Sequence, residues 1–546
     1  MKEKRVLVAL LLVCGFATGC QKTETTNNQK QEILTITAGK QSDENYARYA
    51  AGEDINNNPM IQLGKDELGI SIQYTIRGSS YEDYVNQIRL AMTGAEDLPD
   101  VIPVYDQGLI GEMIESGQVQ AIDQALEDFL PERLQKIYNK FPESFYSVTK
   151  DDKTYGLAIA PVLGETEVLV IRQDWLDKLG LEAPTNLEEF AEVIRAFSEK
   201  DPDGNGQDDT YGFAYSGDGT YSTGWLGDPA MLFSANTGRM IPGNWEEDAD
   251  GNLAYGSIQQ GNKDTLGLMA DWYQKGWLAA DAAVTNDWNA MLAFRDGKAG
   301  MYVGRPSQIE DSIAVTEKFE GAEIGVYPTI RQDNGEPTYQ RAEENDGWFL
   351  FKKDFAELEA FFTYYDWLYD VAFGTGDFKY GYLENYDYDI VDGQPVFDKT
   401  SFDPPKARFS FDPTKAIVTK NSPALDQMLP YHKAIAGGNL TNASEREKSE
   451  LYQTELKPMV IGGNIAYEHQ EELTPNKFRG HLPDDLQDRF TRFQTKESQV
   501  YSDIISGKEP ITAFDDFVKD WQTNGGQAIT EAVNQWYQQV KAGDNP

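Results

Sequence analysis

The sequence predicts an α/β protein with more than one compact unit. Its 546 residues exceed the size at which a single hydrophobic core is usual. Residues 70–76 alternate like a strand, residues 81–92 carry apolar side chains at helical spacing, and Val101-Ile102 begins a second strand. A strand, a helix and a strand in this order are typical of a sheet covered by helices.

Other segments extend this pattern along the chain. Residues 33–37 and 168–171 are predicted strands. Thr185 and Glu188 have the spacing of a capping box, which predicts that a helix begins there. Apolar stripes with helical spacing predict further helices within residues 187–197, 358–368, 514–521 and 529–540.

The composition indicates a folded, strongly acidic protein. Hydrophobic residues make up 40% of the chain and aromatic residues 12%, which is enough to form large cores. There are 90 acidic and 48 basic residues, so the formal net charge is −42. Nucleic acids and anionic bilayer surfaces are polyanions that such a charge repels, so neither is an expected partner.

The sequence has two cysteines and lacks three common enzyme motifs. The two cysteines, Cys14 and Cys20, lie near the N-terminus, so the body of the chain has no internal disulfide and no zinc–thiolate cluster. The sequence has no HExxH pair, no G-x-S-x-G elbow and no GxxxxGK[ST] loop. Zinc peptidases, common serine esterases and P-loop NTPases are therefore disfavoured.

The N-terminus predicts export and lipid attachment. Basic residues at 2–5 precede an apolar run to Phe16, followed by Ala17-Thr18-Gly19-Cys20. This arrangement predicts a signal peptide over residues 1–19, too short to span a bilayer permanently. The last four residues resemble a bacterial lipobox, which implies acylation of Cys20. A polar, flexible tether follows over residues 20–30. An ordinary secretory peptide is the alternative.

An acidic loop at residues 201–209 predicts a calcium site. Oxygen-bearing side chains occur at every second position, and glycines at 204 and 206 permit a tight turn. Calcium takes about six to eight oxygen ligands, which such spacing can place around one point. The expected ligands are Asp201, Asp203, Asn205, Gln207 through its carbonyl group, and Asp209. An EF-hand loop has glutamate at its twelfth position, where this chain has Gly212, so another group must complete the shell. A plain polar turn is the alternative.

Several sequence segments resemble the family 1 extracellular solute-binding proteins of carbohydrate ABC importers. The resemblance is strongest to the long Gram-positive lipoproteins and to the similar alginate-binding proteins. The resemblance is carried by residues 93–101, 171–181, 294–301 and 505–537, so it covers almost the whole mature chain. It implies a monomeric two-lobe α/β protein with ligand in a hinged cleft. The implied first lobe is 31–162 and 288–342, and the implied second lobe is 163–287 and 343–546. The implied location is the outer face of a Gram-positive cell membrane, to which only the lipid anchor attaches the protein. The implied partner there is an ABC permease. In the alginate-binding relatives the acidic loop binds calcium.

A carbohydrate site requires aromatic platforms surrounded by hydrogen-bonding groups. The candidates are Trp225, Trp288, Trp348, Tyr105 and Arg305. Trp225 stands in a loop rich in Gly and Ser, and Trp288 and Trp348 lie near the implied lobe crossings. Each of these residues could instead pack within a loop. Two other functions stay open: binding of a peptide or another non-sugar solute, and a polysaccharide hydrolase or lyase with a carboxylate pair.

Overall fold

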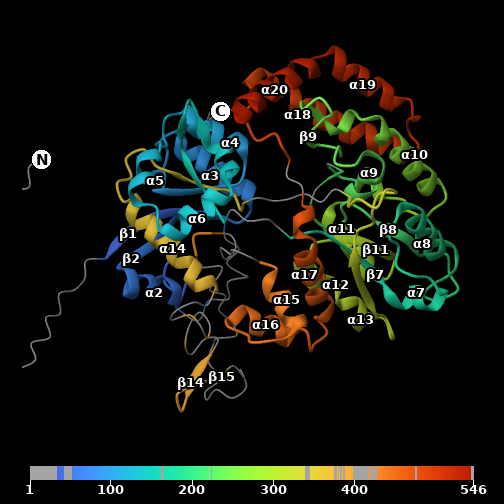
Figure 1. The fold of residues 1–546 in the computed structure, drawn as a ribbon, viewed down its shortest axis with the longest axis horizontal. Coiled ribbons are helices and arrows are strands. Elements are labelled where there is room, and N and C mark those ends of the chain that lie inside the picture. Colours follow the sequence, from blue (N-terminus) through green and yellow to red (C-terminus); the bar gives the residue numbers. More distant parts are fainter. Residues whose placement is uncertain are drawn as a thin grey trace, which may run out of the picture.

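The computed structural model describes residues 33–41, 49, 52–160, 165–219, 221–222, 224–338, 345–373, 378, 380, 384, 388–396, 417–419, 427–473 and 476–542. These residues form two α/β units (Figure 1). One buried hydrophobic cluster lies in the first unit and unites residues 36–160 with residues 348–418. The other buried clusters, in the second unit, draw on residues 168–330 and 428–533. The expected two-lobe fold is confirmed.

The first unit contains a five-stranded sheet in the order β2-β1-β3-β13-β6. Strands β1, β2 and β3 are parallel, whereas β13 is antiparallel to both of its neighbours. The strands are β1 (Leu34–Gln41), β2 (Ile70–Gly78), β3 (Val101–Val104), β6 (Gly156–Ala158) and β13 (Trp348–Phe351). The helices of this part are α2 (Pro59–Leu68), α3 (Tyr81–Met92), α4 (Gln107–Glu115), α5 (Asp123–Phe129), α6 (Glu132–Lys140), η1 (Pro142–Val148) and α14 (Leu358–Phe373).

The second unit contains a four-stranded sheet in the order β12-β7-β11-β8. Its strands are β7 (Val168–Arg172), β8 (Tyr211–Ala214), β11 (Ala299–Gly304) and β12 (Ile324–Pro328). Its helices up to β12 are α7 (Gln173–Leu179), α8 (Leu187–Glu199), α9 (Ala230–Thr237), η2 (Gly256–Ile258), α10 (Gln260–Gln274), η3 (Ala282–Val284), α11 (Asp287–Arg295), η4 (Pro306–Gln308), α12 (Ile309–Ser312) and α13 (Ala314–Lys318). The later helices are α15 (Leu429–Ala436), α16 (Ala443–Leu451), α17 (Lys457–His469) and η8 (Gln470–Glu472).

The C-terminal helices close the second unit around an aromatic cluster. They are α18 (Asp484–Ile505), α19 (Ala513–Thr523) and α20 (Gly526–Ala542), and they pack against the hairpin of β9 (Trp245–Glu247) and β10 (Leu253–Tyr255). Tyr255 and Trp521 stack with their ring centroids 4.6 Å apart. The short pairs β4 (Thr149–Lys150) with β5 (Lys153–Thr154), and β14 (Asp389–Val391) with β15 (Gln394–Val396), complete the strands of the described residues. The apolar stripes predicted at 358–368, 514–521 and 529–540 are confirmed as helices.

The strand pairing corrects the expected lobe boundaries. Residues 288–342 are expected in the first lobe, but β11 and β12 pair with β7 in the second sheet. The start of residues 343–546 is expected in the second lobe, but β13 pairs with β3 and β6, and α14 packs into the first core. The physical reason is burial: the apolar strand Trp348–Phe351 fills the space between β3 and β6, with every residue buried.

The pairing also shows which edges of the two sheets the connections join, and these are called the facing edges below. β6 runs parallel to β3, and its end connects through residues 159–167 to the start of β7. Val168, at that start, pairs with Gly304 at the end of β11 and with Pro328 at the end of β12. The second connection leads from that end of β12 to the start of β13. These two connections therefore join the carboxyl edge of the first sheet to the carboxyl edge formed by β8, β11 and β12. The chain passes between the units a third time, from Val418 in the first core to Met428 in the second.

Candidate functional site

Trp225 and Arg305 lie together at the facing edge of the second unit. Trp225 follows β8 in a loop held to the end of β11, because the Gly227 N–H donates to the Val303 carbonyl oxygen at 2.7 Å. Arg305 immediately follows β11, and its guanidinium lies 5.5 Å from the centroid of the Trp225 ring. The Trp225 side chain is 38% exposed. An exposed indole beside a guanidinium offers an apolar face next to strong hydrogen-bond donors.

Asp228 holds the Trp225 loop in shape. This carboxylate is buried and accepts hydrogen bonds from the backbone N–H groups of Gly224 and Ala230, at 2.5 and 2.7 Å. The bonds close the chain around Trp225 on both sides. These hydrogen bonds therefore fix the backbone that carries the Trp225 indole.

Trp288 joins the same edge from another element. It lies in the first turn of α11, which Asn286 caps by accepting from the Asn289 N–H at 2.9 Å. The preceding Thr285 carbonyl accepts from the Gly217 N–H, in the loop after β8, at 3.0 Å. Trp288 is 43% exposed. Three of the residues predicted for the ligand site, Trp225, Trp288 and Arg305, are thus brought to one edge.

Tyr105 lies at the facing edge of the first unit, where β3 ends. Gly347 has a φ of +91°, and a Cβ atom at that position would come within 2.6 Å of the Tyr105 ring. The ring therefore packs over a glycine that no other residue could replace without a shift. Burial raises the pKa of the Tyr105 hydroxyl, and the nearby charge of Asp346 adds to the effect.

Tyr81 is a neighbour of Tyr105 that no sequence pattern marks as a site residue. Its hydroxyl accepts the Tyr105 N–H at 3.0 Å, and the two rings meet edge to face at 5.3 Å. Tyr81 begins α3, and the helical spacing of residues 81–92 indicates a core stripe. In the structure it is only partly buried. Its position soon after the strand β2 is the signal that could have indicated an edge residue.

Trp348 is corrected from a ligand platform to a core residue. It is the first residue of β13, is 9% exposed, and belongs to the buried cluster of the first unit. Its indole N–H donates to the Ser144 carbonyl oxygen at 2.8 Å. The Trp348 ring therefore packs in the first core, and its donor is used inside the unit.

The acidic loop has the tight turns that its glycines predict. Gly204 and Gly206 both have φ of +76°, and Asp201 has φ of +47°. The Asp201 carboxylate accepts the N–H groups of residues 204, 205 and 206 at 3.0–3.1 Å. The side-chain amide of Asn205 donates to Asp203 at 2.8 Å and to Asp209 at 3.1 Å. The loop thus gathers the carboxylates of Asp203 and Asp209 around one amide group.

Crowding of these carboxylates affects their electrostatics. Partial burial raises the pKa of Asp203, and the charges of Asp209 and Asp201 add to that effect. Within the described part of the chain, no three side chains drawn only from His, Cys, Asp and Glu are arranged to hold a metal ion. The oxygen donors predicted here include the Asn205 amide and the Gln207 carbonyl, so this donor set is a mixed one. Oxygen donors of this kind suit a hard cation.

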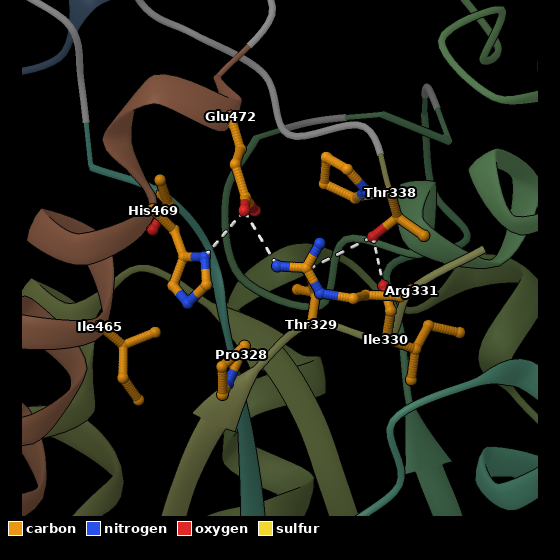
Figure 2. Close-up of a pocket in the computed structure, with 10 residues that line it drawn as sticks. Pro328, Thr329, Ile330, Arg331, Thr338, Ile465, His469 and Glu472 are labelled. Carbon is orange, nitrogen blue, oxygen red and sulfur yellow. Dashed lines mark hydrogen bonds and ion pairs between the residues drawn. The ribbon is translucent and has the colours of Figure 1, made fainter. Parts of the chain in front are cut away.

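A small cavity lies where the two connections leave the second unit (Figure 2). It is lined by Thr166, residues 328–331, Pro337, Thr338, Ile465, His469 and Glu472, and has room for about 10 Å³, one water molecule. Glu472 lies between Arg331 at 2.9 Å and His469 at 3.1 Å (Figure 2). The cavity is too small for a sugar. The contacts of Glu472 with Arg331 and His469 instead join the end of α17 to the segment that leads from β12 to β13.

Cys20 lies outside the described residues, as does the predicted tether. Within the described residues, no helix combines the length and the apolar character needed to cross a bilayer.

Comparison with known proteins identifies the family. Two proteins of Bacillus subtilis (strain 168) are 24% identical to this chain: the polygalacturonan/rhamnogalacturonan-binding protein YtcQ, over 84% of each chain, and the lipoprotein LipO, over 99% of this chain and 100% of LipO.

Among solved structures, the Streptococcus pneumoniae ABC-transporter substrate-binding protein FusA in complex with kestose covers 93% of this chain and 100% of its own, with a TM-score of 0.62 and 19% identity. The alginate-binding protein AlgQ2 without calcium ion has the same TM-score and 15% identity, over 93% of this chain and 98% of its own. The model of the bacterial extracellular solute-binding proteins matches residues 43–370, more than half of the sequence. The chain therefore belongs to the bacterial extracellular solute-binding protein family, whose members bind solutes and are not enzymes.

Proposed function

We propose that this protein captures an oligosaccharide between its two units, outside the cell membrane, and delivers it to an ABC importer. The observation that carries the proposal is the pair of facing edges, with Trp225, Trp288 and Arg305 on one and Tyr81 and Tyr105 on the other. Flat apolar rings beside hydrogen-bonding groups suit the C–H faces and hydroxyl rims of sugars. The carbohydrate ligands of YtcQ and FusA support the same class of solute.

The connections between the units, after β6, after β12 and between Val418 and Met428, are the expected hinge. Binding proteins of this architecture close by rotation of one rigid unit against the other. A ligand that contacts both edges stabilises the closed arrangement, because it gains contacts there that the open arrangement lacks.

Isothermal titration calorimetry with the full-length mature protein tests the proposal. A panel of oligosaccharides of different composition and a panel of short peptides should give heat of binding for at least one saccharide and none for the peptides. Binding of peptides alone would favour the non-sugar alternative. Chromatography of the sugar recovered after long incubation should show it unchanged, whereas shortened products would identify an enzyme.

Lipid attachment at Cys20 is part of the proposed function. The lipobox-like residues 17–20 and the likeness to the lipoprotein LipO support it. One diacylglyceryl group supplies two acyl chains, which are enough for stable anchoring. In a Gram-positive host, the wild-type protein should fractionate with the membrane and Cys20→Ser should appear in the medium. Membrane retention of Cys20→Ser would contradict the anchor.

We further propose that the acidic loop binds calcium as a structural ion. Asp201, Asp203, Asn205, Gln207 and Asp209 would hold it, and the ion would neutralise the crowded carboxylates. Two structurally similar proteins support the proposal, since AlgQ2 has been solved in a form without calcium ion and FusA as an EF-hand mutant.

Thermal unfolding with calcium and with a chelator tests the ion site. Removal of calcium should lower the melting temperature of the wild type by a few degrees. Asp203→Ala should abolish this difference, while Glu127→Gln, which changes an exposed carboxylate on α5, should retain it. An equal loss of the difference in both variants would contradict the site.

A further inference from the structure

The charges on the two facing edges bear on which class of carbohydrate fits between them. We propose that the bound carbohydrate is electrically neutral and that edge carboxylates accept its hydroxyl hydrogens. This inference rests on the function proposed above, because it assumes that a sugar occupies the space between the units.

The edge of the first unit is acidic in its described stretches. Residues 78–82, 104–107, 159–160 and 345–347 contain the acidic residues Glu82, Asp106 and Asp346, and the basic residues next to these stretches are Lys40 on β1 and the exposed Arg77 on β2. Asp346 directly precedes Gly347, over which the Tyr105 ring packs, and its charge acts on the Tyr105 hydroxyl. Asp106 follows Tyr105, and its charge acts on the Tyr81 hydroxyl, as does the opposite charge of Arg89, which is ion-paired with Glu112 at 2.8 Å. The tyrosine pair is therefore flanked by carboxylates.

The edge of the second unit is also rich in carboxylates. Its described stretches 165–167, 215–219, 221–222, 224–229, 281–288, 304–308 and 329–331 contain the acidic residues Glu165, Glu167, Asp218, Asp228, Asp281 and Asp287. Glu167 and Asp228 are buried, so the carboxylates that a ligand could reach are those of Glu165, Asp218, Asp281 and Asp287. The positive side chains of these stretches are Arg305 and Arg331. Arg331 is ion-paired with Glu472 at 2.9 Å, and Arg305 lies over the Trp225 ring.

Lys40, near the end of β1, does not change this balance. Its side chain is 5% exposed, and its ammonium group donates to the carbonyl oxygens of Ile417 and Thr419 inside the first unit. A buried ammonium group that is used by backbone carbonyls is not available to a ligand at the edge.

This distribution favours a ligand that donates hydrogen bonds and carries no charge. Ionised carboxylates only accept hydrogen bonds, and the hydroxyl groups of a neutral sugar are good donors to them. A uronic acid polymer brings one negative charge with each sugar unit. Proteins hold such groups with arginine forks, and juxtaposed like charges at an interface are strongly unfavourable. In the described stretches, acidic residues outnumber arginines on both edges, and Arg331 is already ion-paired.

Calorimetry on the wild-type protein tests this. The neutral probes are kestose, maltotriose, xylotriose and galactotriose, and the acidic probe is trigalacturonate, each with calcium and with a chelator. The expected result is binding of at least one neutral probe at least about a hundredfold tighter than trigalacturonate. Tighter binding of trigalacturonate would overturn the inference while leaving the proposed function standing. Failure of every saccharide would overturn both.

Two isosteric variants connect the result to the named residues. Asp346→Asn and Asp106→Asn each remove one charge, and asparagine can still cap α4 as Asp106 does by accepting the Leu109 N–H at 2.8 Å. Each variant should weaken binding of the neutral probe about fivefold and improve the ratio in favour of trigalacturonate. Glu127→Gln serves as the control and should change neither, since its helix α5 lies on the side of the first unit away from the second (Figure 1). Unchanged ratios in both asparagine variants, with melting temperatures equal to the wild type, would overturn the assignment of these carboxylates.

Discussion

Trp225 and Trp348 are the same residue type at the facing edges of two units, yet their surroundings are opposite. Trp348 begins a strand, is 9% exposed, and donates its N–H to Ser144. Trp225 stands in a loop, is 38% exposed, and lies beside Arg305. The difference comes from the backbone around each ring. The side chains of a central strand point to the faces of the sheet, where packed helices cover them, whereas a loop fixed by one buried carboxylate can present a ring to solvent.

The largest expected effect comes from removing the buried indole. Trp348→Ala should lower the free energy of unfolding by about 3–5 kcal/mol, because it leaves a cavity in the first core and removes the donor to the Ser144 carbonyl. Denaturant unfolding measures the loss. Trp348→Phe keeps most of the packing but not the N–H, so it should lose less. Full stability of Trp348→Ala would contradict its place in the core and reopen its role at the ligand.

The exposed indole should show the reverse pattern. Trp225→Ala should weaken saccharide binding at least about tenfold, ~1.4 kcal/mol, since a stacking face is lost. Its unfolding free energy should stay within about 0.5 kcal/mol of the wild type. Calorimetry and denaturant unfolding on one preparation make the comparison. Equal affinity, or a stability loss as large as that of Trp348→Ala, would remove the contrast between the two residues.

A buried carboxyl in the second unit extends the comparison to acidic groups. Glu497 is fully buried and accepts the Tyr255 hydroxyl hydrogen at 2.7 Å, and burial raises its pKa from 4.5 to about 7. The folded protein therefore holds this proton more tightly than the unfolded chain does. The resulting stability is fully present below the unfolded pKa and is lost as the pH rises to about 7. Between the two pKa values the slope reaches about 1.4 kcal/mol per pH unit.

Glu497→Gln should make the stability less dependent on pH between about 5 and 7, because an amide does not titrate. Unfolding curves at several pH values measure this, with Glu127→Gln as the matched change at an exposed site. If Glu497→Gln kept the wild-type slope, Glu497 would not be the group that titrates.

The smallest expected effect belongs to Arg305. Arg305→Gln should weaken binding about two- to fivefold, because it removes a donor to sugar hydroxyls and a contact that positions the Trp225 ring. An exposed cation–π contact of this kind contributes only ~0.5–1 kcal/mol. Double-mutant calorimetry with Trp225→Ala measures the coupling between the two side chains. Strict additivity of the two losses would show that the guanidinium and the indole act independently.

Local patterns in the sequence predict most of the elements, because strand and helix periodicity are properties of neighbouring residues. The helix at 187–197 is predicted, but the predicted cap lies one residue too early. Asn186 is the N-cap, and Glu189, not Glu188, accepts the Thr185 N–H at 2.8 Å. The pairs 185/188 and 186/189 have the same spacing, and only the backbone geometry distinguishes them.

Partners that are distant in the chain could not be predicted from local patterns. The apolar run Trp348–Phe351 is the strand that completes the first sheet, and without its partners both the lobe boundaries and Trp348 are predicted wrongly. A run of four apolar residues shows that a strand is buried but not beside which strands. The placement of Trp225, Trp288 and Arg305 on one edge also depends on the pairing of β8, β11 and β7, which lie far apart in sequence.

The central position of β13 has a consequence for the newly made chain. β3 and β6 cannot be joined until β13, which follows the whole of the second sheet in sequence, has been synthesised. Until then, β3 and β6 each have an unpaired edge that is prone to aggregation, while the strands of the second sheet are synthesised and assemble. Folding of this protein should be slow, and a chain truncated before residue 348 should leave its first unit unable to mature.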